Sequence, residues 1–226
     1  MDKEYRLFKD NPDVNTKSRS AECERGLLSA IESGNITIFL LSGLDVAQLE
    51  PYRSHGRYIR GKHNRCDGFS TETSTEKRIC KCLYYKNSNF PASCDTCKFR
   101  SDKQYTLTED YQILDYEVPA FYYSKNLGIG EIDLIISDGA TEYATEVKPY
   151  GSRETLLRMI AETLTYTLGD ETHQYRPAIA FFVGSEQENQ YKKASETIRS
   201  ILEKAEITVF QFKVFGDKDK LEICKL

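Results

Sequence analysis

The sequence lacks any apolar run close to the roughly 18 residues that a membrane-spanning helix requires. Its first residues, Met1 to Arg6, also lack the apolar segment of a secretory signal peptide. We therefore expect a cytoplasmic protein with no membrane association. Thiols stay reduced in that compartment, so the seven cysteines are not expected to form disulfides.

Internal repeats and low-complexity tracts are absent as well, and 226 residues suffice for one large domain or for one domain with an insertion. The composition changes twice along the chain. It predicts an N-terminal part of the core at 1–50, a basic cysteine-rich insertion at 51–104, and the rest of the core at 105–226.

Apolar residues recur at helical spacing in some segments and alternate in others. Ser18 or Ser20 could cap the first helix and Ser152 the second, and Asp138-Gly139 is a strong hairpin signal. The run 36–41 fits either a strand or a buried helical turn. The other expected elements are helices at 17–33, 152–168 and 188–204, and strands at 116–123, 131–137, 142–147, 178–183 and 207–214. Their order predicts an α/β fold with a mixed sheet covered by helices.

The net charge of −4 is distributed unevenly. Residues 51–104 hold 12 Lys and Arg against 5 Asp and Glu, whereas the remainder holds 19 against 30. The same segment is poor in aliphatic residues, and aromatic residues such as Tyr58 and Phe69 are interleaved with its basic ones. Basic and aromatic side chains together suit a nucleic-acid backbone and exposed bases. An ordinary solvated charged surface is the alternative interpretation.

Four cysteines of this segment form two close pairs. They are Cys80, Cys82, Cys94 and Cys97. Tetrahedral Zn²⁺ commonly takes four thiolates from two such pairs, and it would supply the folding energy that this core-poor stretch lacks. Cys66 or His63 could replace one ligand of the first pair. An iron–sulfur cluster, which also takes four thiolates, is the alternative.

Asp133, Glu146 and Lys148 lie on two apolar strands that a short turn connects. A buried, unpaired carboxylate is costly, and a metal ion would supply the missing partner for Asp133. Glu146 and Lys148 alternate with Val147, so they project to one face of their strand. Two carboxylates match the ligands of Mg²⁺, with the carbonyl of Val147 as a third protein ligand, and the lysine could orient a metal-activated water. The simpler interpretation is a cross-strand ion network.

The chain resembles the PD-(D/E)XK nuclease superfamily, the fold of many restriction enzymes and RecB-like exonucleases. Asp133 corresponds to the motif aspartate, and Glu146 with Lys148 to its (D/E)XK element, although no proline precedes Asp133. The resemblance covers roughly residues 17–41 and 115–214. It implies a restriction-endonuclease-like core, catalysis by these residues with Mg²⁺ or Mn²⁺, and, in many members, a homodimer.

The resemblance also implies roles for helical residues. Members carry an acidic residue on the first helix, and Glu24 shares the inward face of Leu27 there, whereas Glu22 points elsewhere. The Gln-x-x-x-Tyr element of RecB-like members corresponds to Glu162 and Tyr166, with glutamate in place of glutamine. Arg153 could contact phosphate. In members that hold an iron–sulfur cluster the cysteines bracket the core, whereas here all four precede it, which favours zinc.

Together these features predict a Mg²⁺-dependent nuclease acting on DNA, with a structural zinc site in the insertion that binds the substrate. The alternative is a catalytically inactive nucleic-acid-binding protein that keeps the nuclease-like fold and the zinc.

Overall fold

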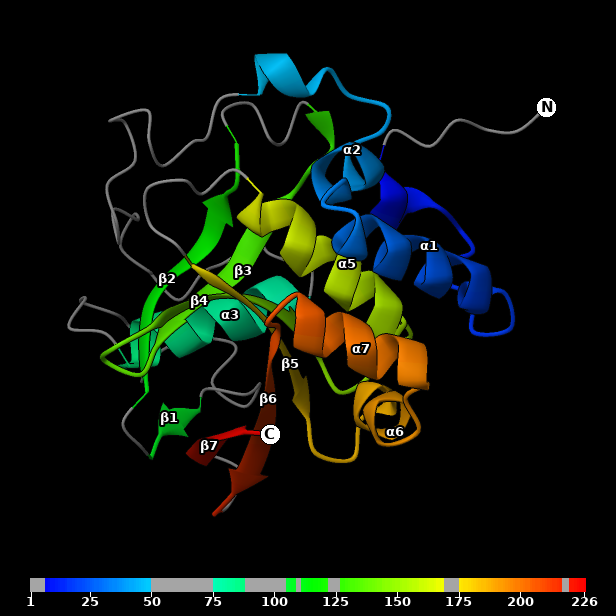
Figure 1. Ribbon diagram of the computed structural model, residues 1–226. Coiled ribbons are helices and arrows are strands. Elements are labelled where there is room, and N and C mark those ends of the chain that lie inside the picture. The colour runs from blue at the N-terminus through cyan, green and yellow to red at the C-terminus, as the bar shows by residue number, and fades with distance from the viewer. Residues whose placement is uncertain are drawn as a thin grey trace.

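The computed structural model describes residues 7–49, 75–87, 105–108, 111–121, 127–168, 175–216 and 220–226. Within them the chain adopts an α/β fold, in which a seven-stranded mixed sheet is flanked by helices (Figure 1). The strands are β1 (Thr106–Leu107), β2 (Gln112–Pro119), β3 (Glu131–Ser137), β4 (Glu142–Lys148), β5 (Arg176–Phe182), β6 (Thr208–Phe215) and β7 (Lys220–Lys225). The α-helices are α1 (Ser20–Glu32), α2 (Ile36–Leu40), α3 (Thr75–Asn87), α5 (Leu156–Thr167), α6 (Glu186–Lys192) and α7 (Glu196–Lys204).

The sheet has the order β1-β7-β6-β5-β4-β3-β2. Strands β2, β3 and β4 form an antiparallel meander, whereas β5 and β6 run parallel to β4 and are reached through α5 and through α6–α7. Two short 3₁₀ helices, Phe8–Asp10 and Val46–Gln48, complete the described elements. The expected α/β architecture with a mixed sheet is therefore confirmed.

Helices cover the sheet on both faces. Ile132 and Ile135 of β3 belong to one apolar cluster with residues of α1, α5 and α7, and Leu134 and Ile136 belong to a second cluster with α3. Nearly every residue of β3 and β4 is buried for this reason. A strand buried on both faces has no polar side, which makes Asp133, Glu146 and Lys148 exceptional.

The turn between β3 and β4 follows the sequence signal. Gly139 has a φ of +86°, which glycine adopts without strain, and Asp138 accepts hydrogen bonds from the amides of Ala140 and Thr141. The turn sets the register in which Leu134 lies opposite Thr145. Continued by one residue, this register brings Asp133 opposite Glu146.

Several boundaries differ from those expected. The segment predicted as one helix at 188–204 divides into α6 and α7, because Ser195 caps a new helix through the amide of Ile198. Helix α5 is capped by Thr155 rather than Ser152, and Arg19 precedes α1 without a side-chain cap. The run 36–41 contains helix α2, and β7 was not expected from the sequence.

The largest difference is α3, which lies inside the segment expected to be a core-poor insertion. Ile79, Leu83 and Tyr84 are buried on this helix and pack on the second face of the sheet. Residues 75–87 thus belong to the main core. The basic residues between the apolar ones conceal the helical period, so the composition of the segment was a poor guide to its structure. Among the described helices, none has the length and apolar character needed to cross a membrane.

Candidate active site

Asp133 and Glu146 lie side by side on β3 and β4, with Lys148 two residues further along β4. They expose only 8%, 2% and 3% of their surfaces. The amide of Val147 donates a hydrogen bond of 2.8 Å to Asp133 Oδ2, which fixes that carboxylate across the two strands. The structure thus brings together the three residues expected from the sequence, and the side chain of Val147 packs in the core below them.

Glu76, near the start of α3, joins this group from the helix that packs on the second face of the sheet. One carboxylate oxygen from each of Glu76, Asp133 and Glu146 lies within 4.8 Å of the others, so these residues could hold one metal ion. Glu76 was not among the site residues expected from the sequence. Its position three and four residues before Ile79 and Cys80, on the buried side of α3, was the signal that could have found it.

The ammonium group of Lys148 is enclosed by carboxylates. Its Nζ lies 2.5 Å from Glu146 Oε1, 3.0 Å from Glu76 Oε2, 2.9 Å from Glu154 Oε2 and 3.3 Å from Glu162 Oε2. Glu154 comes from the loop before α5, and Glu162 from α5 itself. Carboxylates from α3, from β4, from the loop before α5 and from α5 thus surround one lysine.

Arg158 of α5 lies between the last two of these carboxylates. Its Nη2 is 3.1 Å from Glu162 Oε1, and its Nε is 3.5 Å from Glu154 Oε1. Arg158 therefore pairs with both of these glutamates. Its side chain keeps 24% exposure, so part of the guanidinium group faces the cavity described next.

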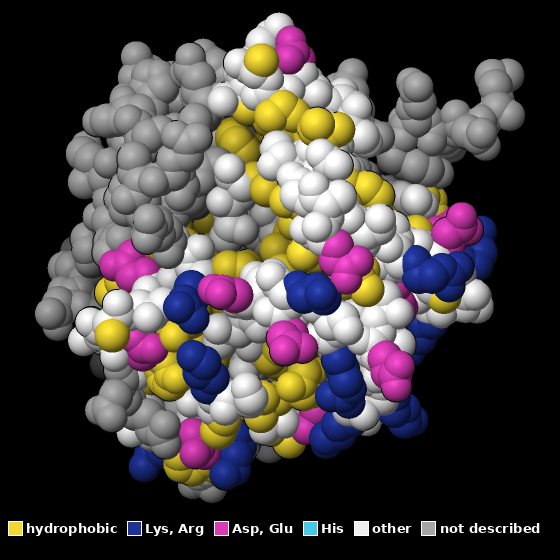
Figure 2. Space-filling view, in the orientation of Figure 1, with side chains coloured by type: hydrophobic (Ala, Val, Ile, Leu, Met, Phe, Trp, Pro, Cys, Tyr) yellow, Lys and Arg dark blue, Asp and Glu magenta, His cyan; other side chains and the backbone are white. Residues whose placement is uncertain are grey.

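A cavity of about 410 Å³ opens over the cluster. Seven carboxylates and three cationic side chains line it, so its walls are strongly acidic. Lys77 lies on its rim, 3.5 Å from Glu117 and 3.8 Å from Glu131. On the face shown in Figure 2, by contrast, acidic and basic side chains of the described residues are interspersed.

Burial and mutual repulsion shift the pKa values of this group. Burial, together with the neighbouring charge of Glu76, raises the pKa of Asp133 well above its usual range, and burial with Asp133 does the same for Glu146. Burial also raises the pKa of Glu76. For Lys148, burial opposes the charged form, but Glu146, Glu162 and their neighbours outweigh it and raise the pKa well above its usual value.

Tyr166, expected from the sequence beside Glu162, lies in the wall of the same cavity. Gly130 explains how the ring fits. Its φ is +96°, and a Cβ at this position would lie 2.7 Å from the Tyr166 hydroxyl oxygen. Glycine is thus required twice, by the backbone conformation and by the close approach of the ring.

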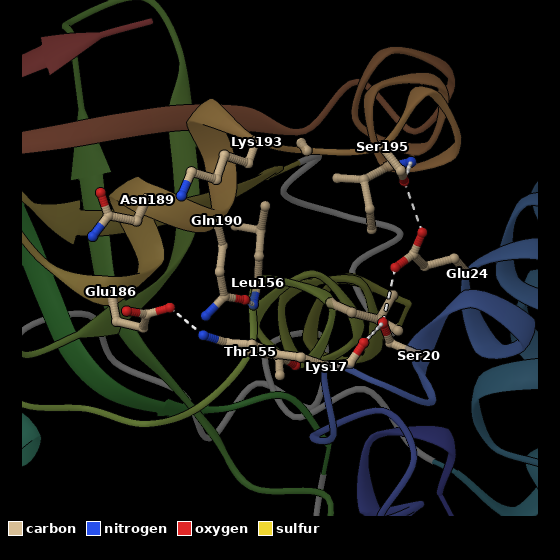
Figure 3. Close-up of a pocket in the computed structure, with 13 residues that line it drawn as sticks. Lys17, Ser20, Glu24, Thr155, Leu156, Glu186, Asn189, Gln190, Lys193 and Ser195 are labelled. Carbon is tan, nitrogen blue, oxygen red and sulfur yellow. Dashed lines mark hydrogen bonds and ion pairs between the residues drawn. The ribbon is translucent and has the colours of Figure 1, made fainter.

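Glu24 does not reach this cluster. It lines a separate pocket between α1, α5, α6 and α7, where it accepts hydrogen bonds from Ser20 Oγ at 3.0 Å and Ser195 Oγ at 2.7 Å (Figure 3). Helix α1 packs against α7, and Glu24 contacts Ser195, the N-cap residue of α7, instead of the carboxylates on β3 and β4. Arg153 is exposed on the loop between β4 and α5, before the helix on which it was expected, and it does not line the cavity.

The first cysteine pair lies on α3. Cys80 is 1% exposed among apolar side chains, and burial raises the pKa of its thiol well above the usual value. Cys82 is half-buried, and residues two apart on a helix do not share a face. One ion therefore cannot take both thiols while α3 is helical. Cys94, Cys97, Cys66 and His63 lie outside the described residues.

No family model, curated protein or solved structure matches this chain. The fold and the site by themselves define an α/β protein with a buried cluster of carboxylates around one lysine. Three carboxylates at these separations suit a hard divalent cation. A lysine beside them is placed to stabilise negative charge that develops on a bound group.

Proposed function

We propose that this chain is a divalent-metal-dependent nuclease of the PD-(D/E)XK type that hydrolyses phosphodiester bonds in DNA. The observation that carries the proposal is the convergence of Glu76, Asp133 and Glu146 beside Lys148 in one acidic cavity. An order of three antiparallel strands, a helix and a parallel strand supports the same assignment.

The residues present fit Mg²⁺ or Mn²⁺. Glu146 Oε2 is buried and has no hydrogen-bond partner among the described residues, so one lone pair is available for an ion. The donor set consists of carboxylate oxygens, which hard cations prefer. Repulsion within the carboxylate group also favours a dication, because the two cations Lys148 and Arg158 face five carboxylates there.

Each residue has a defined task in this proposal. Glu76, Asp133 and Glu146 hold the ion, which when bound polarises a phosphoryl oxygen and lowers the pKa of a coordinated water. Lys148 orients the attacking water and stabilises the negative charge that develops on the phosphorus oxygens. Glu154 and Glu162, which do not belong to the three ligands, would hold the ammonium group beside the ion.

The choice of nucleic acid as substrate rests on the basic and aromatic residues of 51–104. Zinc in the same segment stays part of the proposal as a structural metal. Because Cys80 is buried in the core, Cys82 is the better ligand of the first pair, with Cys94, Cys97 and either Cys66 or His63 completing the set.

A cleavage assay tests the proposal. Plasmid and oligonucleotide substrates are incubated with Mg²⁺ or Mn²⁺ and with wild type, Asp133→Ala, Lys148→Ala or Glu76→Gln. We expect each substitution to lower the cleavage rate by roughly 100-fold or more, since each removes a metal ligand or the charge beside it.

Two variants serve as matched controls. Lys204→Ala removes an exposed lysine that pairs with Glu32, and Glu24→Gln changes a glutamate that lies in the separate pocket. Both should cleave within about threefold of wild type. Equal cleavage by wild type and Lys148→Ala would remove the proposed site. Salt-sensitive DNA binding without cleavage in any divalent ion would instead favour the inactive nucleic-acid-binding protein.

A further inference from the structure

The loop formed by residues 149–153 lies next to Lys148 at both of its ends. It starts directly after Lys148 in the chain, and Glu154, which follows the loop, contacts the Lys148 ammonium group at 2.9 Å. Two residues span at most about 7 Å of extended chain, so Tyr150 lies close to the candidate catalytic lysine. Glu154 lines the cavity over Lys148, whereas Tyr150 and Arg153 do not, so the loop presents these two side chains outside the cavity, a few residues along the chain from Lys148.

This loop exposes an aromatic ring and a cation. Tyr150 is 58% exposed, and Arg153 is also exposed. Within the described part of the chain, neither side chain has a hydrogen bond or ion pair. Val183, which precedes the glycine against which Tyr150 lies, is also a large exposed apolar residue, at 42%.

Buried groups hold the loop in one shape. The amide of Ser152 donates to the carbonyl of Pro149 at 2.9 Å, and the amide of Glu154 donates to Ser152 Oγ at 3.2 Å. Gln187, which is fully buried, donates from Nε2 to the carbonyls of Ser152 and Glu154. The exposed groups are thus carried by a fixed backbone, which lowers the entropy cost of binding through them.

The ring of Tyr150 lies close to the glycine in the turn after β5. A Cβ on Gly184 would lie 3.2 Å from the Tyr150 hydroxyl oxygen, and Gly184 has a φ of +80°. The hydroxyl end of the ring therefore lies over the backbone of Gly184, in the turn after β5.

We propose that the 149–153 loop binds an unpaired nucleotide next to the scissile phosphate, with the base stacked on Tyr150 and a backbone phosphate on Arg153. This inference rests on the proposed nuclease function and names its substrate class: single-stranded DNA, or a duplex with a single-stranded end. A base can offer its face to an aromatic ring only when it is unstacked, and stacking of this kind tolerates any base.

Binding measurements test the loop independently of cleavage. In an Asp133→Asn background, which prevents turnover, fluorescence anisotropy gives the Kd of a labelled single-stranded oligonucleotide and of a blunt duplex of the same sequence. We expect Tyr150→Ala to raise the single-strand Kd by about 5- to 140-fold, the range for one stacked base, and to leave the duplex Kd within about twofold.

Tyr150→Phe keeps the ring and should bind like the parent, which separates stacking from loss of the hydroxyl. Phe215→Ala removes an exposed aromatic at the end of β6 and should change neither Kd. Arg153→Ala should weaken single-strand binding and reduce its salt dependence. Circular dichroism confirms that each variant is folded.

The outcomes separate the two proposals. A single-strand Kd that Tyr150→Ala leaves unchanged, or an equal loss for duplex and single strand, overturns the loop assignment even if the enzyme cleaves DNA. Absence of single-strand binding by the parent overturns it as well. Tyr150-dependent single-strand binding by a wild type that cleaves nothing would support the loop and remove the nuclease.

Discussion

At the scale of single residues, the surroundings of Lys148 determine what the site can do. Four carboxylates contact its ammonium group, yet a lysine needs only one charged partner. Glu76 and Glu146 are shared with the possible metal position, whereas Glu154 and Glu162 are tied to Arg158. If Glu76 and Glu146 bind a cation, Lys148 therefore still has Glu154 and Glu162 as partners.

Gly130 leads to a prediction about stability. Gly130→Ala should destabilise the protein by about 1–3 kcal/mol more than Gly139→Ala, because a methyl group there meets the Tyr166 hydroxyl at 2.7 Å. Gly139 also has a positive φ, but its Cβ would meet nothing within 4 Å, so that variant has only the backbone strain. Urea unfolding followed by circular dichroism measures both.

The double variant Gly130→Ala/Tyr166→Phe tests whether the Tyr166 hydroxyl causes the loss of stability. Tyr166→Phe deletes the atom that a Cβ at Gly130 would approach most closely, so the double variant should recover part of the stability lost in Gly130→Ala. Equal unfolding free energies for Gly130→Ala and Gly139→Ala would show that the ring moves aside without cost.

The site could be predicted from the sequence where local rules determine it. Alternation places Glu146 and Lys148 on one face, and a two-strand hairpin brings Asp133 opposite Glu146. Glu76 lies 57 residues before Asp133 in the chain, and only tertiary packing joins them. Glu24 lies on the inward face of its helix, as expected, but it contacts α7. The apolar spacing of a helix predicts which face is inward, and it does not predict which element packs against that face.

At the scale of elements, the strands of the meander were predictable and α3 was not. β3 has the expected bounds, because a continuous apolar run between turn signals has few alternatives. Helix α3 carries lysine, arginine and two cysteines among its apolar residues. Those residues favoured a metal-stabilised loop, yet Ile79, Leu83 and Tyr84 still bury one side of the helix.

The position of α3 changes the expectation for zinc. Cys80→Ala should leave the zinc content of the purified protein unchanged, because its thiol lies in an apolar cluster on a different helical face from Cys82. Cys94→Ala and Cys82→Ala should lower the zinc content and the melting temperature together. Elemental analysis by mass spectrometry measures the metal.

The variant Lys81→Ala, on the same helix, serves as the control. Loss of zinc in Cys80→Ala would mean that α3 unwinds around Cys80 to release it as a ligand. Iron in place of zinc, with a brown protein, would favour the cluster alternative.

At the scale of the whole molecule, the sheet places charged groups where its two faces cannot neutralise them. Apolar clusters fill both faces, and the acidic cavity lies between α3 on one side and α5 on the other. Without a cation, the fold encloses several carboxylates near one another. Some of its stability is thereby given up to form the site.

This cost should appear in the dependence of stability on pH and metal. Burial raises the pKa values of Asp133 and Glu146, so between their ordinary and raised pKa values the folded state holds more protons than the unfolded state. The free energy of unfolding of the metal-free protein therefore falls as the pH rises above about 4.5. Lys148, whose pKa is also raised, contributes evenly over this range and loses its contribution only at higher, alkaline pH.

Glu146→Gln removes one of these acids, so without metal it should be more stable than wild type by roughly 0.5–2 kcal/mol at pH 8, with the difference shrinking toward pH 4.5.

Mg²⁺ needs the charged carboxylates. It should stabilise wild type increasingly as the pH rises, by about 2.7 kcal/mol when present at 100 times its Kd, and should have much less effect on the variant. Urea unfolding with and without Mg²⁺ gives both quantities, and Glu203→Gln, an exposed glutamate on α7, controls for surface charge. If Mg²⁺ stabilised wild type and Glu146→Gln equally at every pH, the ion would bind elsewhere, and the carboxylates around Lys148 would be a structural ion network.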